Sequence, residues 1–98
     1  MILNNIFVRD SVTPILKNFD IRYAGLFGSV ARGESREQSD VDLLIDIGHP
    51  MGMVSYMKFI NELESVLHTS VDVVSLNSIQ PALKREIQKD LQTIYEKR

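Results

Sequence analysis

The chain has 98 residues, of which 44% are hydrophobic and 24% charged, with a formal net charge of −2. This length and balance predict one globular domain over residues 1–98, not a disordered segment. The absence of cysteine excludes disulfides, thiolate metal ligands and a cysteine nucleophile. The acidic balance argues against stable nucleic-acid binding, which depends on neutralising phosphates. With no apolar run of ~18 residues and no signal peptide, we expect a cytoplasmic protein that does not enter a membrane.

The first predicted element is a helix that begins at Thr13 and Pro14, an N-cap and first-turn pair. The sequence does not decide the structure of residues 1–9, which could form one or two further helical turns. A strand from about 21 to 27 follows, because this stretch is rich in β-branched and aromatic residues. Gly28 ends that strand, and residues 29–32 can open a short helix.

The second predicted strand covers residues 41–47 and has apolar residues at every odd position. Side chains alternate between the two faces of a strand, so the odd positions face a core. Asp40 and Asp42 then project from the opposite face. A Gly-His-Pro sequence at 48–50 ends this strand.

Apolar residues at helical spacing predict a third helix over residues 53–67, with Met53 and Met57 in its buried stripe. Residues 71–75 predict a short third strand. A last helix is expected from Ser78 or Pro81, and one apolar face continues it to the end of the chain: Leu83, Ile87, Leu91 and Tyr95. The resulting fold class is α/β (α+β), a small mixed sheet of three to four strands flanked by helices.

Three carboxylates and one turn carry the chemistry of the chain. Asp40 and Asp42 share a strand face, about 6–7 Å apart at the backbone, and repel each other unless a cation lies between them. Asp72 is the single charge in the apolar third strand, and a third carboxylate would complete a two-metal site there. Hard oxygen ligands together with substrate phosphates are the usual environment of Mg²⁺ in nucleotide enzymes.

The Gly28-Ser29 turn supplies the phosphate side of this site. Glycine permits close backbone approach, and the N–H groups of the following helix together with the serine hydroxyl can bind an anion. Each feature alone also has a plain explanation: a common turn, a solvated strand end, or a paired core carboxylate in the case of Asp72. Their combination at this spacing favours the metal and phosphate interpretation.

The segment from Gly28 to Asp46, GSVARGESREQSDVDLLID, resembles the signature of the DNA polymerase beta nucleotidyltransferase superfamily. Within it, the chain is similar to the minimal nucleotidyltransferases (MNT), which have about this length and the same nucleotidyltransferase fold. The resemblance implies that Gly28 and Ser29 hold the triphosphate of ATP. It also implies that Asp40 and Asp42 bind two Mg²⁺ ions and that Asp72 completes the site.

The family resemblance implies a reaction and a partner as well. The reaction transfers AMP from ATP to an acceptor hydroxyl and releases pyrophosphate. MNT proteins are typically antitoxins of helical HEPN-domain toxins, and some of them silence the toxin by adding AMP to one of its tyrosines. We expect this role, and an acceptor presented by another chain. The alternatives are stoichiometric binding without catalysis and transfer to a small molecule such as an aminoglycoside; homo- or hetero-oligomers are compatible with each.

Several other residues are weaker candidates. Arg32, one helical turn after Ser29, and Arg36 are placed to meet the γ-phosphate, although a solvated pair in a loop is an equal alternative. Asp46 lies ~13 Å along the strand from the metal pair and is expected to face solvent or a partner. His49 and His68 have no second histidine at metal-ligand spacing, so zinc binding is not expected.

Overall fold

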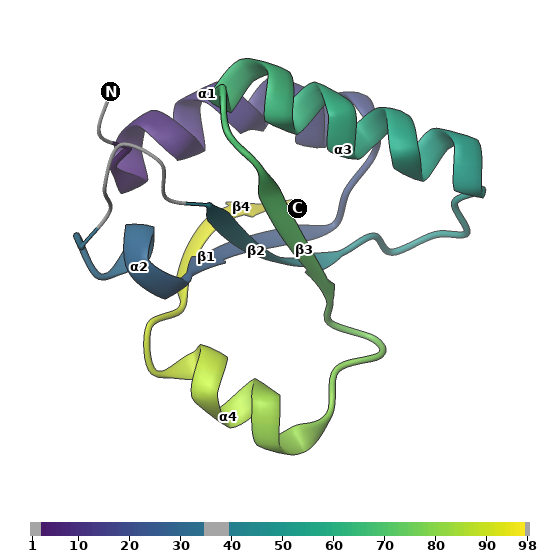
Figure 1. Cartoon of the computed structure of the whole chain (residues 1–98). Coiled ribbons are helices and arrows are strands. Elements are labelled where there is room, and N and C mark those ends of the chain that lie inside the picture. The colour runs from purple at the N-terminus through teal and green to yellow at the C-terminus, as the bar shows by residue number, and fades with distance from the viewer. Residues whose placement is uncertain (1–2, 35–39, 98) are drawn as a thin grey trace.

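The computed structural model describes residues 3–34 and 40–97. Four helices alternate with four strands along the chain, as Figure 1 shows. The elements are α1 (Asn5–Asn18), β1 (Tyr23–Phe27), α2 (Gly28–Ala31), β2 (Val41–Asp46), α3 (Met53–Leu67), β3 (Val71–Ser75), α4 (Pro81–Gln88) and β4 (Gln92–Glu96).

The strands form one sheet in the order β3-β2-β1-β4. β1 is antiparallel to both β2 and β4, whereas β2 and β3 are parallel. A parallel pair needs a long crossover connection, and α3 provides it. The predicted mixed sheet and α/β class are therefore confirmed, with four strands.

Two layers of helix enclose this sheet (Figure 1). α1 and α3 lie together over one face, α4 lies over the other, and α2 follows the end of β1. The odd positions of β2, including Leu43 and Ile45, are fully buried in the core with α1 and α3, as their alternation predicts. Leu44 is also buried on the α4 side, at 2% exposure. No helix in the described residues is long and apolar enough to cross a membrane.

The predicted start of the first helix is wrong. α1 begins at Asn5, with the Asn4 side chain accepting a hydrogen bond from the Phe7 amide at 2.8 Å. This bond satisfies one of the free amide groups of the first turn. Pro14 lies inside the helix, and the Thr13 hydroxyl donates to the Arg9 carbonyl at 2.6 Å instead of capping a helix start. Tertiary packing of the apolar face of α1 outweighs the local cost of the proline.

The predicted end of the last helix is also wrong. α4 stops at Gln88, and the final residues form β4, which pairs with the outer edge of β1. The four-residue spacing of Leu91 and Tyr95 suggested a helix, but the sequence Gln-Thr-Ile-Tyr-Glu also suits a strand. The edge of β1 favours the strand, because pairing with β4 satisfies backbone groups from Tyr23 to Leu26 that would otherwise lack a partner.

The third helix has the predicted limits, 53–67, but its first two turns do not reach the core. Phe59, Leu63 and Leu67 are buried, and the Phe59 ring packs against Phe19 with a centroid distance of 5.3 Å. Met53, predicted to be buried, is 75% exposed, and Met57 is 52% exposed. The helix thus extends beyond the sheet that it covers (Figure 1).

Candidate nucleotide and metal site

The turn between β1 and α2 brings the backbone close to an acidic side chain. Gly28 has a φ of +79°, in the left-handed region that glycine adopts without strain. A Cβ atom built on Gly28 would overlap Oδ2 of Asp42. Any side chain at this position would therefore displace the Asp42 carboxylate. The Gly28 backbone therefore lies against Asp42, one of the predicted metal ligands.

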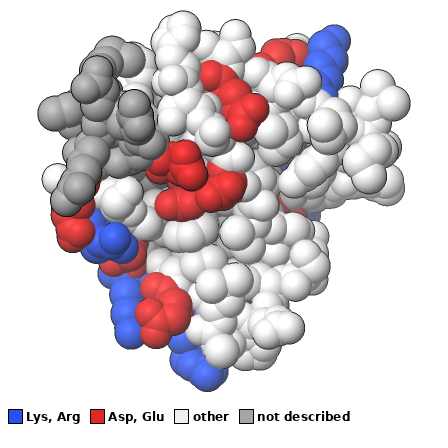
Figure 2. Space-filling view, in the orientation of Figure 1, with Lys and Arg blue, Asp and Glu red and all other residues white. Residues whose placement is uncertain are grey.

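The strand register aligns the acidic residues. Phe27, the last residue of β1, pairs with Asp42, and Asp42 in turn pairs with Asp72 across the parallel strands β2 and β3. Asp40 immediately precedes β2 and acts electrostatically on Asp42. The three predicted carboxylates therefore lie near the starts of β2 and β3. The Gly28 turn follows the end of β1, the strand next to β2. In Figure 2 acidic side chains cluster on this part of the surface.

The pKa of Asp42 reflects its partial burial and the negative charges of the neighbouring carboxylates. Partial burial, the negative charges of Asp72 and Asp40 and a hydrogen bond with Asp72 together raise the pKa of Asp42 to about 6, with burial the largest cause. The positive charge of Arg32 acts in the opposite direction. Asp72 itself is exposed rather than buried in an apolar strand. The arrangement is one that a bound cation would relieve.

The donor set fits Mg²⁺ bound together with phosphate. No group of three or more acidic, histidine or cysteine side chains in the described part of the chain forms a metal site by itself. Mg²⁺ usually takes only one or two protein carboxylates and completes its shell with waters and substrate phosphates. Asp42 and Asp72 supply such a pair.

Arg32 is held at the end of α2 by two carboxylates. Its Nη1 donates to Asp90 at 2.7 Å, and its Nε lies 3.2 Å from the Glu34 carboxylate. These hydrogen bonds, that to Asp90 first, raise the pKa of the guanidinium above its ordinary value. Asp90 is a residue that the sequence did not point to, because 58 positions separate the pair and no local pattern joins them. The other predicted cation, Arg36, lies outside the described residues.

Asp46 differs from its prediction. Its side chain is only 13% exposed, so it is largely covered by neighbouring residues. Arg22 lies 3.8 Å from one of its oxygens, and the Asn77 amide lies 3.5 Å from the other. Asp46 is therefore a structural carboxylate at the far end of β2, consistent with its exclusion from the metal site.

Both histidines have local structural positions. His49 lies between two backbone carbonyls, 2.9 Å from that of Pro50 and 3.0 Å from that of Phe19. His68 ends α3 as its C-cap, with a left-handed φ of 56°.

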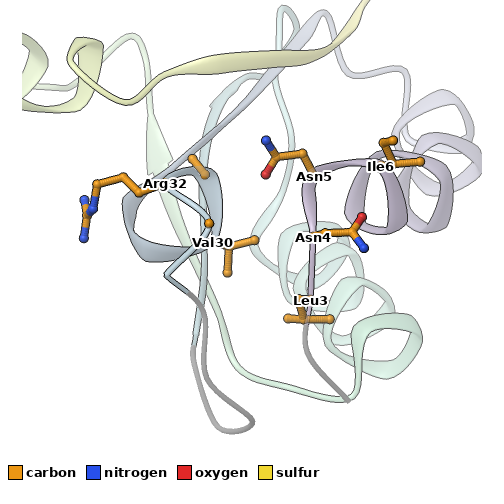
Figure 3. Close-up of a pocket in the computed structure, with 8 residues that line it drawn as sticks. Leu3, Asn4, Asn5, Ile6, Val30 and Arg32 are labelled. Atoms are coloured by element: carbon orange, nitrogen blue, oxygen red, sulfur yellow. The ribbon is translucent and has the colours of Figure 1, made fainter.

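A hollow of about 500 Å³ lies beside α2, between that helix and the start of α1 (Figure 3). Leu3, Asn4, Ile6 and Val30 contribute to its lining, and Figure 3 shows Arg32 pointing away from them. None of the three carboxylates borders it. The hollow is therefore separate from the candidate site at the carboxylates and the Gly28 turn.

A glycine turn that approaches an acidic cluster, on a small mixed sheet with a helical crossover, is the arrangement expected of an enzyme that handles nucleotide phosphates. Residues 10–98 match the polymerase beta nucleotidyltransferases, and the chain belongs to this family of enzymes.

Three similar proteins illustrate the family. A protein of Methanocaldococcus jannaschii, provisionally named a protein adenylyltransferase, is 39% identical over 80 residues, which cover 82% of this chain and 86% of that protein. The protein adenylyltransferase MntA of Thermococcus cleftensis is 31% identical over 75 residues, covering 76% of each chain. The structure of a tri-AMPylated Shewanella oneidensis HEPN toxin in complex with MNT antitoxin matches with a TM-score of 0.71 at 17% identity, covering 95% of this chain and 73% of that chain. The last likeness supports the fold.

Proposed function

We propose that this nucleotidyltransferase transfers AMP from ATP to a tyrosine hydroxyl of a HEPN-domain toxin and thereby acts as its antitoxin. The observation that carries the proposal is the Asp42–Asp72 pair facing across β2 and β3, directly beside the Gly28 turn. Two similar proteins are named protein adenylyltransferases, and a structural neighbour is a complex with an AMPylated HEPN toxin. The transfer of AMP and the HEPN partner come to this chain from those names, and the tyrosine acceptor comes from the family resemblance.

In this proposal the residues of the site have separate tasks. Gly28 and Ser29 hold the triphosphate through backbone amides and the serine hydroxyl. Asp40, Asp42 and Asp72 hold two Mg²⁺ ions, which when bound neutralise phosphate charge and favour an in-line displacement. A bond forms between the acceptor oxygen and the α-phosphorus as the bond to pyrophosphate breaks, and the acceptor proton leaves through solvent.

Asp72 and Arg32 lie on opposite sides of Asp42. Asp72 is exposed on the edge strand β3, so an acceptor hydroxyl can reach it without displacing other elements. Arg32 belongs to the α2 side, where the leaving pyrophosphate would lie. Its charge acts on Asp42 although it is already bound to Asp90 and Glu34. We propose that it stabilises the charge of the leaving group.

The test uses labelled ATP, Mg²⁺ and a purified HEPN-domain protein as the acceptor. We expect label on the partner with the native enzyme and a loss of more than about 100-fold in Asp42→Asn, because a metal ligand is removed. Asp46→Asn, on the same strand and the same face, is the matched control and should keep the activity. Absence of label with the native enzyme would overturn the proposal. If Asp42→Asn still neutralised the toxin fully, the antitoxin would act by stoichiometric binding.

A further inference from the structure

The first two turns of α3 carry an apolar surface that no other part of the described chain covers. Met53 is 75% exposed, Val54 is 84% exposed and Met57 is 52% exposed; we call these three residues the methionine patch. Core packing begins only at Phe59. The methionine patch therefore contributes little to holding the fold together, and its apolar character calls for another explanation.

The patch is contiguous, which distinguishes it from scattered exposed residues. Positions 53, 54 and 57 are neighbours on a helix, since residues one, three and four apart lie on adjoining parts of its surface. The sequence from 50 to 57, Pro-Met-Gly-Met-Val-Ser-Tyr-Met, contains no charge. Single exposed apolar residues are ordinary, but grouped ones mark interaction surfaces. Methionine suits such a surface because its flexible thioether adapts to a partner.

The position of the patch relates it to the catalytic site. In Figure 2 the projecting end of α3 and the acidic cluster are visible on the same face of the molecule, and the surface between them is largely uncharged. β3, the edge strand of the sheet, carries Asp72 of this cluster near its start, and the first turns of α3 project beyond the sheet on the same side as β3 (Figure 1). A protein that delivers a hydroxyl to Asp42 and Asp72 approaches over this edge. The surface that it covers then extends toward the first two turns of α3.

A second copy of this chain is a poorer occupant. A stable symmetric interface buries about 800 Å² on each partner, and three side chains supply only a fraction of that area. The size of the patch suits an anchor within a wider interface, in which a few central apolar residues carry most of the binding energy. The rest of that interface would come from the uncharged surface that leads to the carboxylates.

We propose that the methionine patch anchors the acceptor protein, through an apolar depression on that partner, while the acceptor hydroxyl lies at Asp42 and Asp72. This inference rests on the proposed function, since it assumes a protein acceptor. The inference adds the place on this enzyme where the acceptor protein binds. It assigns acceptor binding and nucleotide binding to different parts of the surface.

The test compares the double variant Met53→Glu/Met57→Glu with the native enzyme, using the purified HEPN partner. Both positions are exposed, so the fold should tolerate the change. We expect partner affinity to fall by about 100-fold or more, because two anchors of a hot spot become charged. The KM for the partner should rise while the kcat at saturating partner and the affinity for MgATP stay within about two-fold. Ile6→Glu, a 63% exposed position on α1, is the control and should change none of these values.

The outcomes separate this inference from the proposed function. Native-like partner affinity and labelling in the double variant would overturn the inference and leave the proposed function standing. If the native enzyme bound but never labelled the partner, and the double variant lost that binding, the proposed function would fail while the anchor stood. A native dimer that the double variant converts to a monomer, with partner binding unchanged, would assign the patch to a second copy and overturn the inference.

Discussion

Gly28 and Gly33 have nearly the same left-handed backbone, with φ values of +79° and +74°, but very different surroundings. A Cβ atom at Gly28 would overlap the Asp42 carboxylate, whereas one at Gly33 would meet nothing within 4 Å. The two positions therefore separate the cost of backbone strain from the cost of disturbing the site. Both Gly→Ala changes should destabilise the fold by about 1 kcal/mol through strain alone.

We predict that Gly28→Ala reduces nucleotide transfer by more than about 100-fold, because misplacement of a ligand by ~1 Å costs about this much. Gly33→Ala should keep transfer within about three-fold of the native value, since its added methyl group meets no atom. Initial rates with labelled ATP measure the difference, and thermal melts confirm that both variants fold. Equal rates in the two variants would show that the contact between Gly28 and Asp42 does not matter.

A second prediction concerns the proton on Asp42, whose pKa is raised to about 6 chiefly by burial and by Asp72. A carboxyl with a raised pKa stabilises the fold below its unfolded value of 3.8, and this contribution is lost as the pH rises through about 6. Carbon-detected NMR of the metal-free protein should show Asp42 titrating near pH 6. Asp72→Asn should lower that midpoint by removing a neighbouring charge, and Asp46→Asn should leave it unchanged. An unchanged midpoint in Asp72→Asn would contradict the pairing.

At the scale of the elements, the helices and strands predicted correctly are those in which residues at both ends mark where the element begins and stops. α3 and β3 have the predicted limits, and so does the turn at Gly28. The grouping of Gly28, Asp42 and Asp72 could be predicted because a glycine turn and the alternation of side chains along a strand fix positions locally. β4 could not, since its pairing with β1 is a long-range contact that competes with a plausible helix pattern. The pairing of Arg32 with Asp90 was missed for the same reason.

Pro14 gives a prediction at this scale. A proline inside a helix removes one hydrogen bond and crowds the preceding turn, at a cost of up to ~3 kcal/mol. Pro14 is exposed, so alanine would lose little packing there. We expect Pro14→Ala to stabilise the protein by about 1 kcal/mol or more, measured by urea unfolding. Pro81→Ala is the matched control: Pro81 lies in the first turn of α4, where proline is favourable, so stability should not rise.

The contacts of His49 predict that the stability of the protein depends on pH, because this side chain connects the end of α1 to the loop before α3. Its two ring nitrogens both face carbonyl oxygens, those of Pro50 and Phe19, and only the protonated ring donates to both. These hydrogen bonds, that to Pro50 first, raise the pKa of His49. The resulting stabilisation is complete below ~6.5, the ordinary value, and is lost as the pH rises through the folded value. The native protein should therefore melt higher than His49→Gln at about pH 5.5 but not at about pH 9. A difference that is constant with pH would argue against the charged bridge.

At the scale of the whole molecule, one core connects the site to global stability. β1 and β2, which bear the Gly28 turn and Asp42, also supply the central strands of the sheet and much of that core. Ligand that binds the folded state should therefore protect the entire domain. At a concentration 100 times its dissociation constant, MgATP should add about 2.7 kcal/mol, visible as one shifted melting transition. Asp42→Asn should show no shift, and a second, unshifted transition would contradict a single cooperative unit.

The parallel pairing of β2 with β3 also affects how the molecule folds. The antiparallel β1–β2 pair requires only the closure of a loop, so the Gly28 turn and Asp42 meet early. Asp72 joins them only after the whole of α3 has folded back across the sheet, and such long-range contacts form slowly. A growing or refolding chain therefore holds half of its site before it can hold the other half. Recovery of activity should lag behind formation of the β1–β2 pair, so completion of the acidic cluster is a late step of folding.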